Sequence, residues 1–398
     1  MARTLPLEDV VVADFSRVLA GPYATMLLAD LGATVIKVER PGSGDDTRSW
    51  GPPWTERGSA YFESVNRGKR SITLDLADPG DQRAAHELVD RADVLVENFR
   101  AGSLARYGLD AESALQRNER LVYASISGFG SADGANLPGY DFVVQAVGGL
   151  MSITGESAGP PNKVGVAVVD ILTGKDAALG VMAALRHRES TGRGQHVEVN
   201  LLSSLLSSLT NQLSGYLATG ADPGRMGNQH PSITPYETLR CEDRLLAVAV
   251  GNDGQFRRFT EELGLLGTAD DPRFATNGAR VANREELVAL LENVLGARTA
   301  ADWQERLQRA GIACGPVNSI SGAVEHADSL GLQPLVETAE DALPQVRNPL
   351  GLGELPDHAE TGPPSPPPLL GEHTDEVRSW LGGGQLHGRQ PPTKANRT

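Results

Sequence analysis

Aromatic residues, cysteines and long hydrophobic runs are all scarce in this chain of 398 residues. Phe, Trp and Tyr make up 5% of it, and there are two cysteines, Cys241 and Cys314. Two widely separated cysteines exclude a disulfide-stapled fold and fit a reducing compartment. No apolar run approaches the ~20 residues of a membrane-spanning helix, and no signal-peptide core is visible. We therefore expect a soluble, cytoplasmic protein with no membrane partner and a core of Ala, Val and Leu.

Positive charge is also in short supply. Lys and Arg number 36 against 51 Asp and Glu, which gives a formal net charge of −15. Such a surface repels a phosphate backbone unless the basic residues form a local stripe, and here they are scattered. We therefore expect no nucleic-acid partner. The balance of 40% hydrophobic and 22% charged residues is typical of a globular protein, and the length allows two domains.

Strand-like and helix-like segments alternate through the first 200 residues. Helices are expected over 23–31, 80–91 and 171–187, and strands over 10–15, 34–39, 71–76, 93–97, 121–127, 164–169 and 196–200. This alternation is typical of βαβ units and a mostly parallel sheet. A long apolar helix is expected over 201–217. Two antiparallel strands within 238–250, followed by helical patterns, predict a smaller α+β domain.

The common motifs for nucleophiles, nucleotides and metals do not apply here. The sequence Gly155-Glu156-Ser157-Ala158-Gly159 fits G-x-S-x-G, but that motif needs a helix directly after the serine. Two prolines follow instead, so Ser157 is expected in a surface loop. No glycine-rich nucleotide motif follows a strand. The eight histidines are dispersed, so we expect no metal site.

Asp170 is the most informative acidic residue. It follows the apolar run 164–169 and precedes a predicted helix. One interpretation is a helix N-cap, a position at which Asp is favoured. The other is a functional carboxylate at the end of a strand, where α/β folds place their chemistry. The two are compatible, because helix N–H groups are expected to keep the carboxylate ionised and thus nucleophilic.

Several stretches, taken in order, resemble the class III coenzyme A transferases, a family that also contains α-methylacyl-CoA racemases. They include DFSRVLAGP at 14–22, NRGKRS at 66–71, ENFR at 97–100, CGPV at 314–317 and LGEHT at 370–374. The matches cover almost the whole chain. The resemblance implies an α/β fold with a Rossmann-like parallel-sheet large domain built from both chain ends. It also implies a smaller α+β domain between them and an interlocked ring dimer of two identical subunits.

The same resemblance sets the expected domain borders. The large domain is expected over 1–200 and 344–382, and the small α+β domain over 226–318. A linker helix at 201–225 and a linker at 319–343 join them, and 383–398 is expected to be a disordered tail.

The resemblance further implies a reaction, the transfer of CoA from an acyl-CoA donor to a small carboxylic acid, with a dicarboxylate as one candidate. Asp170 matches the family's nucleophile, which forms an aspartyl mixed anhydride and then an aspartyl-CoA thioester, and Asp141 is the second expected catalytic residue. Acyl-CoA is a substrate, and no tightly bound cofactor is expected. Phosphate pairing is also implied for Lys69 and Arg70. The residues matching CoA contacts are Val18, Leu19, Ala20, Arg40, Leu74, Ala77, Asn98, Phe99, Arg100, Arg106 and Tyr140.

Two departures from the family pattern bear on function. Racemase members have His-Asp where this chain has Tyr140-Asp141, and α-proton exchange needs two bases. The transferase is therefore favoured, with a racemase or epimerase and a non-catalytic acyl-CoA-binding protein as the alternatives. Some transferases have Gln where Leu19 stands, and no glycine-rich lid is evident near 250–254. The substrates, and the loop that covers the intermediate, are left open.

Overall fold

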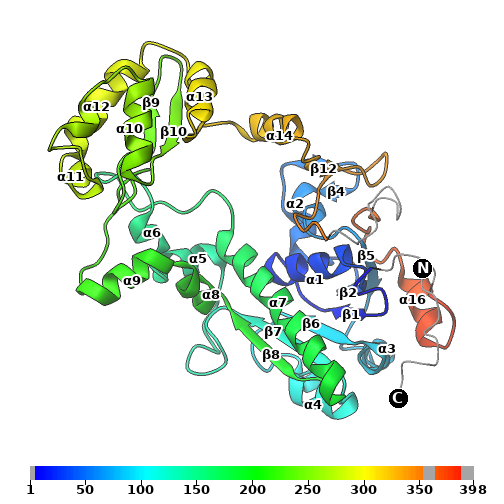
Figure 1. Cartoon of the computed structure of the whole chain (residues 1–398). Coiled ribbons are helices and arrows are strands. Elements are labelled where there is room, and N and C mark those ends of the chain that lie inside the picture. Colours follow the sequence, from blue (N-terminus) through cyan, green and yellow to red (C-terminus); the bar gives the residue numbers. More distant parts are fainter. Residues whose placement is uncertain (1–4, 353–363, 387–398) are drawn as a thin grey trace. The chain divides into compact units, whose positions relative to one another are not determined.

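The computed structural model describes residues 5–352 and 364–386 (Figure 1). The chain divides into two compact units. Unit 1 takes the described residues of Met1–Leu150, Val164–Ala218 and Gln333–Thr398, and unit 2 takes Met151–Lys163 and Thr219–Leu332. Both ends of the chain thus contribute to unit 1. Residues 151–163, which we placed in the large domain, belong to unit 2.

Unit 1 contains a six-stranded sheet in which each neighbouring pair is parallel. The strand order is β5-β2-β1-β6-β7-β8, so the chain builds outward from β1 in one direction and then in the other. This is the order of a doubly wound Rossmann sheet, with the switch point between β1 and β6. The strands are β1 (Val11–Asp14), β2 (Thr34–Glu39), β5 (Lys69–Thr73), β6 (Val94–Glu97), β7 (Val122–Ser127) and β8 (His196–Asn200).

Helices cover both faces of this sheet. Alternate residues of a strand point to opposite faces. Accordingly, Val12 and Val35 pack with helices α1 (Ala20–Asp30) and α7 (Val168–Thr191). On the other face, Val11 and Ile36 pack with α3 (Pro79–Arg91), α4 (Ala111–Arg117) and the C-terminal α16 (Thr374–Leu381). Leu386 is also buried in this second core, so the packed chain extends past the expected tail border at 383; positions 387–398 of that tail lie outside the described residues.

Unit 1 also contains shorter elements. The 3-10 turns are η1 (Asp46–Ser49) and η2 (Ala105–Tyr107), and the short strands are β3 (Trp54–Thr55), β4 (Gly58–Ser59), β12 (Leu335–Val336) and β13 (Gln345–Val346). Its further helices are α2 (Ala60–Glu63), α5 (Asp141–Val147) and α8 (Leu201–Ser208). Two helices cross the border between the units: α6 (Leu150–Ile153) and, by its last residue, α9 (Thr210–Thr219).

Unit 2 is a small α+β assembly with its own core. Its antiparallel sheet has the order β11-β10-β9, formed by β9 (Tyr236–Arg240), β10 (Leu245–Ala249) and β11 (Ala313–Pro316). Phe256, Leu287 and Trp303 are buried against this sheet. The helices are α10 (Asp253–Glu262), α11 (Asn277–Ala282), α12 (Arg284–Leu295), α13 (Ala300–Arg309) and α14 (Ile320–Ser329), with the 3-10 turn η3 (Thr268–Asp270).

Two predicted elements are wrong. The run 164–169 is not a strand: α7 begins at Val168, inside it. A short apolar run does not distinguish a strand from the start of a buried helix, and here the backbone N–H of Val164 bonds to a side chain rather than to a neighbouring strand. The single helix over 201–217 is divided into α8 and α9, because Thr210 adopts a left-handed conformation with φ of 38°.

Candidate active site

Asp170 lies in the first turn of α7 and faces a second carboxylate. It is the third residue of the helix, so it is not the N-cap; that position is Ala167, whose side chain makes no capping bond. The cap comes instead from Asp141, the first residue of α5. Its Oδ1 accepts hydrogen bonds from the backbone N–H groups of Val169 at 2.8 Å and Asp170 at 3.3 Å. Asp141 therefore stabilises the helix end that positions Asp170.

Gln145, one turn further along α5, fixes Asp141 in place. Its Nε2 donates to Asp141 Oδ2 at 2.7 Å, and its Oε1 accepts from the Val164 N–H at 2.9 Å. Asp141 is 8% exposed and Gln145 is fully buried. The amide thus connects the acid to the segment leading into α7. Gln145 was not among the predicted site residues, because nothing in the local sequence distinguishes it from any other helical glutamine.

The surroundings of Asp170 favour its neutral form. Burial, and secondly the negative charge of Asp141, raises the pKa of Asp170 to about 7. We expected the helix N–H groups to keep this carboxylate ionised, but the N–H groups of Val169 and Asp170 bond to Asp141 instead, and the pKa of Asp170 is raised rather than lowered. A carboxyl group poised in this way becomes a more basic nucleophile when it ionises.

The loop between β1 and α1 packs beside Asp170. Val18 and Leu19 belong to one apolar cluster with Tyr61, Ala167 and Ile171; the last two are three residues before and one residue after Asp170. Burial, together with the charges of Asp170 and Asp141, raises the pKa of Tyr61 to about 12. Tyr61 therefore keeps its proton and can donate a hydrogen bond near Asp170. It was not predicted as a site residue, because a single tyrosine outside any motif carries no sequence signal.

This loop is strained and tightly held. Val18 has a φ of 68°, which is rare for a β-branched residue. Its N–H is directed at Asp45, with N···O distances of 3.2 and 3.3 Å. Lys37 joins the two sides: its Nζ donates at 2.9 Å to Asp45 Oδ2 and at 2.9 Å to the carbonyl oxygen of Ser16. Both members of this ion pair are buried, so the contacts stay dry and strong.

Asn98, in the loop after β6, holds the backbone of Arg17, the residue before Val18. Its Oδ1 accepts from the Arg17 N–H at 2.8 Å, and its Nδ2 donates to the Arg17 carbonyl at 2.6 Å. In the same way Glu97 accepts from the Phe99 N–H at 2.8 Å. The loops that follow β1 and β6 are thereby fastened to each other at the switch point.

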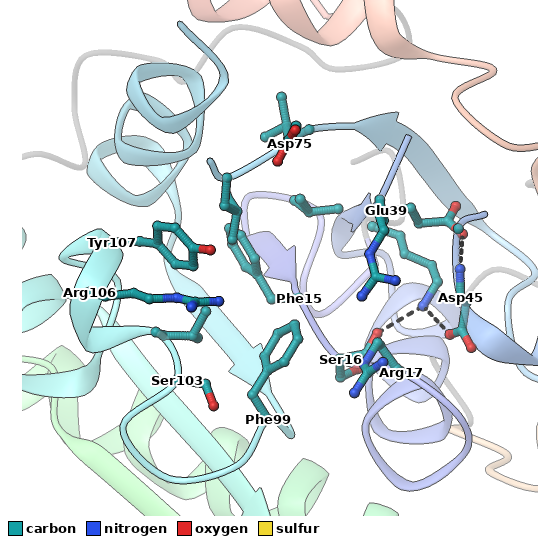
Figure 2. Close-up of a pocket in the computed structure, with 17 residues that line it drawn as sticks. Phe15, Ser16, Arg17, Glu39, Asp45, Asp75, Phe99, Ser103, Arg106 and Tyr107 are labelled. Atoms are coloured by element: carbon teal, nitrogen blue, oxygen red, sulfur yellow. Dashed lines mark hydrogen bonds and ion pairs between the residues drawn. The ribbon is translucent and has the colours of Figure 1, made fainter. Parts of the chain in front are cut away.

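A cavity opens where these loops meet (Figure 2). Phe15 and Arg17 line it after β1, Arg40 after β2, Leu74 after β5 and Phe99 after β6, so it lies at the carboxyl ends of the strands. Ligands of doubly wound folds bind at this position. About 180 Å³ is free inside it. Since whole small-molecule sites usually measure ~300–1,000 Å³, the cavity suits one end of an extended ligand.

The cavity combines aromatic walls with a ring of cations. Phe15, Phe99 and Tyr107 form apolar surfaces, and Figure 2 shows Arg106 and Arg17 approaching them from different sides. Among the acids that line it, Glu39 pairs with Arg48 at 2.7 Å, and Asp45 pairs with Lys37 as described above. The third lining acid, Asp75, is exposed and accepts from the Ala77 N–H. The lining thus combines arginines, whose guanidinium groups are suited to oxyanions, with two acids that are already paired.

The predicted CoA contacts fall into three groups. Arg40, Leu74, Phe99 and Arg106 line the cavity. Val18, Leu19 and Ala20 continue from it toward Asp170, in the loop and first turn of α1. The others lie outside its lining: Asn98 uses its amide on Arg17, Arg100 Nη2 lies 3.5 Å from Asn136 Oδ1, and Ala77 and Tyr140 are exposed.

Two predicted phosphate contacts are placed elsewhere. Lys69 is fully buried, and its Nζ donates to Asp14 at 3.1 Å and to the Pro22 carbonyl at 2.9 Å. Burial lowers the pKa of Lys69 to about 8 although Asp14 opposes this. Lys69 is therefore an internal ion-pair partner and the prediction that it binds phosphate is wrong. Arg70 faces Glu376 of α16 at 3.7 Å.

Other expectations concern metals, membranes and Ser157. In residues 5–352 and 364–386 no group of His, Cys, Asp and Glu side chains is arranged to hold a metal ion. Over the same part of the chain, every helix is too short or too polar to cross a membrane. Ser157 lies between α6 and α7 in a stretch without a helix directly after it, as expected.

Comparison with known proteins identifies the family. The model of CoA-transferase family III matches residues 7–374. The succinate–glutarate CoA-transferase of Agrobacterium fabrum is 44% identical over 95% of this chain and 96% of its own length. The acetyl-CoA:oxalate CoA-transferase of Acetobacter aceti is 39% identical over 90% of this chain and 92% of its own length. A crystal structure of a CaiB/BaiF family protein from Brucella suis is 42% identical over 95% of this chain and all of that one, with a TM-score of 0.85. The chain therefore belongs to the class III CoA-transferases.

Proposed function

We propose that this enzyme transfers CoA from an acyl-CoA to a small carboxylic acid, with Asp170 as the covalent nucleophile. One observation carries the proposal. The loop 15–20 lines the cationic cavity with its first residues and packs beside Asp170 with its next ones. An extended thioester bound along it would have its nucleotide in the cavity and its acyl group at the carboxylate.

The parts of acyl-CoA match the parts of this path. The adenine ring has aromatic surfaces available at Phe99 and Tyr107, and the phosphates have Arg40 and Arg106. The pantetheine arm would follow Val18–Ala20. The cavity is large enough for only one end of such a ligand, which agrees with an extended pose.

The proposed chemistry has four balanced steps. The Asp170 carboxylate attacks the thioester carbonyl, the C–S bond breaks, and CoA thiolate leaves a mixed anhydride. The thiolate attacks the aspartyl carbonyl, which releases the donor acid and forms an aspartyl-CoA thioester. The acceptor carboxylate attacks that thioester and expels the thiolate again. The thiolate then attacks the acyl carbonyl of the new anhydride, which gives the product and free Asp170 carboxylate.

Hydroxylamine trapping tests the nucleophile. Hydroxylamine added with acyl-CoA should convert Asp170 to a hydroxamate, located by peptide mass spectrometry, and inactivate the enzyme. Asp170→Asn should abolish transfer and labelling, while Asp176→Asn, an exposed acid on the same helix, should retain both. Labelling elsewhere, or an active Asp170→Asn variant, would refute the role of Asp170. Exchange of the α-proton of acyl-CoA without any acceptor would instead support a racemase.

We propose a small dicarboxylate as the acceptor class. The similar proteins named above act, by their names, on succinate, glutarate and oxalate. A screen of succinyl-CoA and acetyl-CoA against mono- and dicarboxylates of increasing length, read by kcat/KM, tests this. Preference for monocarboxylates would overturn it.

We also propose that two copies of the chain form the interlocked homodimer typical of the family. Apolar side chains on unit 1 are exposed on α5 and α9, among them Phe142 at 58%, Val147 at 63% and Leu217 at 73%. Exposed apolar surface of this kind marks subunit contacts. Sedimentation of a stable monomer at micromolar concentration would contradict it.

A further inference from the structure

Arg17 is a cavity residue that the family resemblance did not single out. It directly follows Phe15 and Ser16 in the loop after β1, and its guanidinium lies over the Phe99 ring, 5.1 Å from the ring centre. One arm is paired: Nη1 donates to Asp46 Oδ2 at 2.9 Å. Figure 2 shows the side chain at the same opening as Phe99 and Asp45.

The other edge of this guanidinium lacks a protein partner. Nε of Arg17 is closed off from solvent and has no hydrogen-bond partner among the described residues. Within the same residues, the ion pair of Arg17 with Asp46 runs through Nη1 and leaves Nη2 unused. Buried N–H donors are nearly always satisfied, so an orphan of this kind calls for an explanation. The backbone cannot turn to relieve it, because Asn98 binds both the N–H and the carbonyl oxygen of Arg17.

The unpaired edge has a defined chemical preference. The Nε–Nη2 side of arginine presents two parallel donors, which fit two oxygens of a phosphate or carboxylate. Arg40 and Arg106 line the same cavity, and both are exposed. Three guanidinium groups exceed what one carboxylate needs and match a group that carries several phosphate charges.

We propose that the Nε–Nη2 edge of Arg17 binds a phosphate group of the nucleotide end of acyl-CoA. This rests on the proposed acyl-CoA site and adds a residue to it. Asp46 holds Nη1 and the Phe99 ring supports the guanidinium plane, so the edge is preorganised before the ligand arrives. Because Val18 is the next residue, binding at Arg17 also anchors the strained loop that leads to Asp170.

Calorimetric titration of the full-length protein with CoA, 3′-dephospho-CoA and pantetheine tests the proposal without relying on catalysis. Arg17→Gln should weaken CoA binding at least tenfold and leave pantetheine binding unchanged. Arg17→Lys keeps the charge but not the two-donor edge, so its CoA affinity should lie between those of the unaltered protein and Arg17→Gln. Arg117→Gln removes an exposed pair with Asp90 outside the cavity and serves as the matched control. Thermal unfolding verifies that each variant is folded.

The three ligands separate the outcomes. If the effect of Arg17→Gln persists with 3′-dephospho-CoA, the edge binds the diphosphate; if it disappears, the edge binds the 3′-phosphate. Unchanged CoA affinity, an equal loss with pantetheine, or a raised KM for the acceptor acid alone would overturn the proposal. Failure of the unaltered protein to bind CoA would instead refute the proposed acyl-CoA site itself.

Discussion

The ionisation of Asp170 predicts a pH dependence that an ordinary aspartate would not have. The nucleophile is the ionised form, and burial with the charge of Asp141 raises the pKa of Asp170 to about 7. The reactive fraction is then about 9% at pH 6, about 50% at pH 7 and about 91% at pH 8. The first chemical step should therefore accelerate roughly tenfold between pH 6 and pH 8. With an unperturbed carboxyl group it would be flat over this range.

Asp141→Asn is the perturbation that isolates the cause. The amide oxygen of asparagine can still accept from the Val169 N–H, which keeps the helix cap, but the charge is gone. The pKa of Asp170 should fall and the midpoint of the profile should move to lower pH. Burial, the larger of the two causes, remains, so the midpoint should stay above that of an exposed aspartate.

Single-turnover release of CoA thiol, quenched in acid and quantified by chromatography, measures this step without product release. Enzyme is kept in excess over acyl-CoA, and circular dichroism at each pH verifies that the protein is folded. A rate that is constant from pH 5.5 to 8.5, or a midpoint that moves to higher pH in Asp141→Asn, would refute the assigned ionisation.

Three further changes follow from the same contacts. Asp170→Asn should be more stable than the unaltered protein above pH 7, by up to about 4 kcal/mol in urea unfolding, since a raised folded-state pKa penalises the ionised form; this advantage should disappear toward pH 4. Asn98→Ala removes two hydrogen bonds to Arg17 worth about 1 kcal/mol each, and should raise the KM for acyl-CoA roughly 10- to 30-fold with a smaller effect on kcat. An unchanged KM would mean that the loop after β1 keeps its conformation without the hydrogen bonds from Asn98. Lys37→Met leaves Asp45 buried without its partner and should cost about 3–5 kcal/mol of stability, partly restored by Lys37→Met with Asp45→Asn. Equal stability of the single and double variants would show that the two are not coupled.

The parallel sheet could be predicted because its strands carry a strong pattern. Buried parallel strands are continuous apolar runs, as in Val11–Asp14 and Val94–Glu97, and the first of these runs is followed by a helix-like segment. The run at 164–169 has a similar apolar composition, but the Val164 N–H bonds to the Gln145 side chain and α7 begins at Val168. Pairing is decided by tertiary contacts, so composition alone assigned it wrongly.

The choice of Asp170 as a candidate site residue could be made from the sequence, but its electrostatics could not. Its neighbour Asp141 is 29 positions away in the sequence, and the cap it supplies depends on where α5 begins. The same holds for Lys69, whose charge is indistinguishable in the sequence from that of Arg40. Only the fold shows that one is buried against Asp14 while the other lines the cavity.

Asn98 and Arg17 show why a ligand contact and its support are hard to separate from sequence. Both are polar, both follow a strand of the switch point, and both lie in stretches that resemble the family. In the structure Asn98 uses its donor and acceptor on the backbone of Arg17, while Arg17 lines the cavity and its Nε is buried without a hydrogen-bond partner among the described residues. A satisfied amide holds the loop, and an unsatisfied guanidinium can bind a ligand. Hydrogen-bond satisfaction, rather than residue type, therefore assigns the binding role to Arg17 and the positioning role to Asn98.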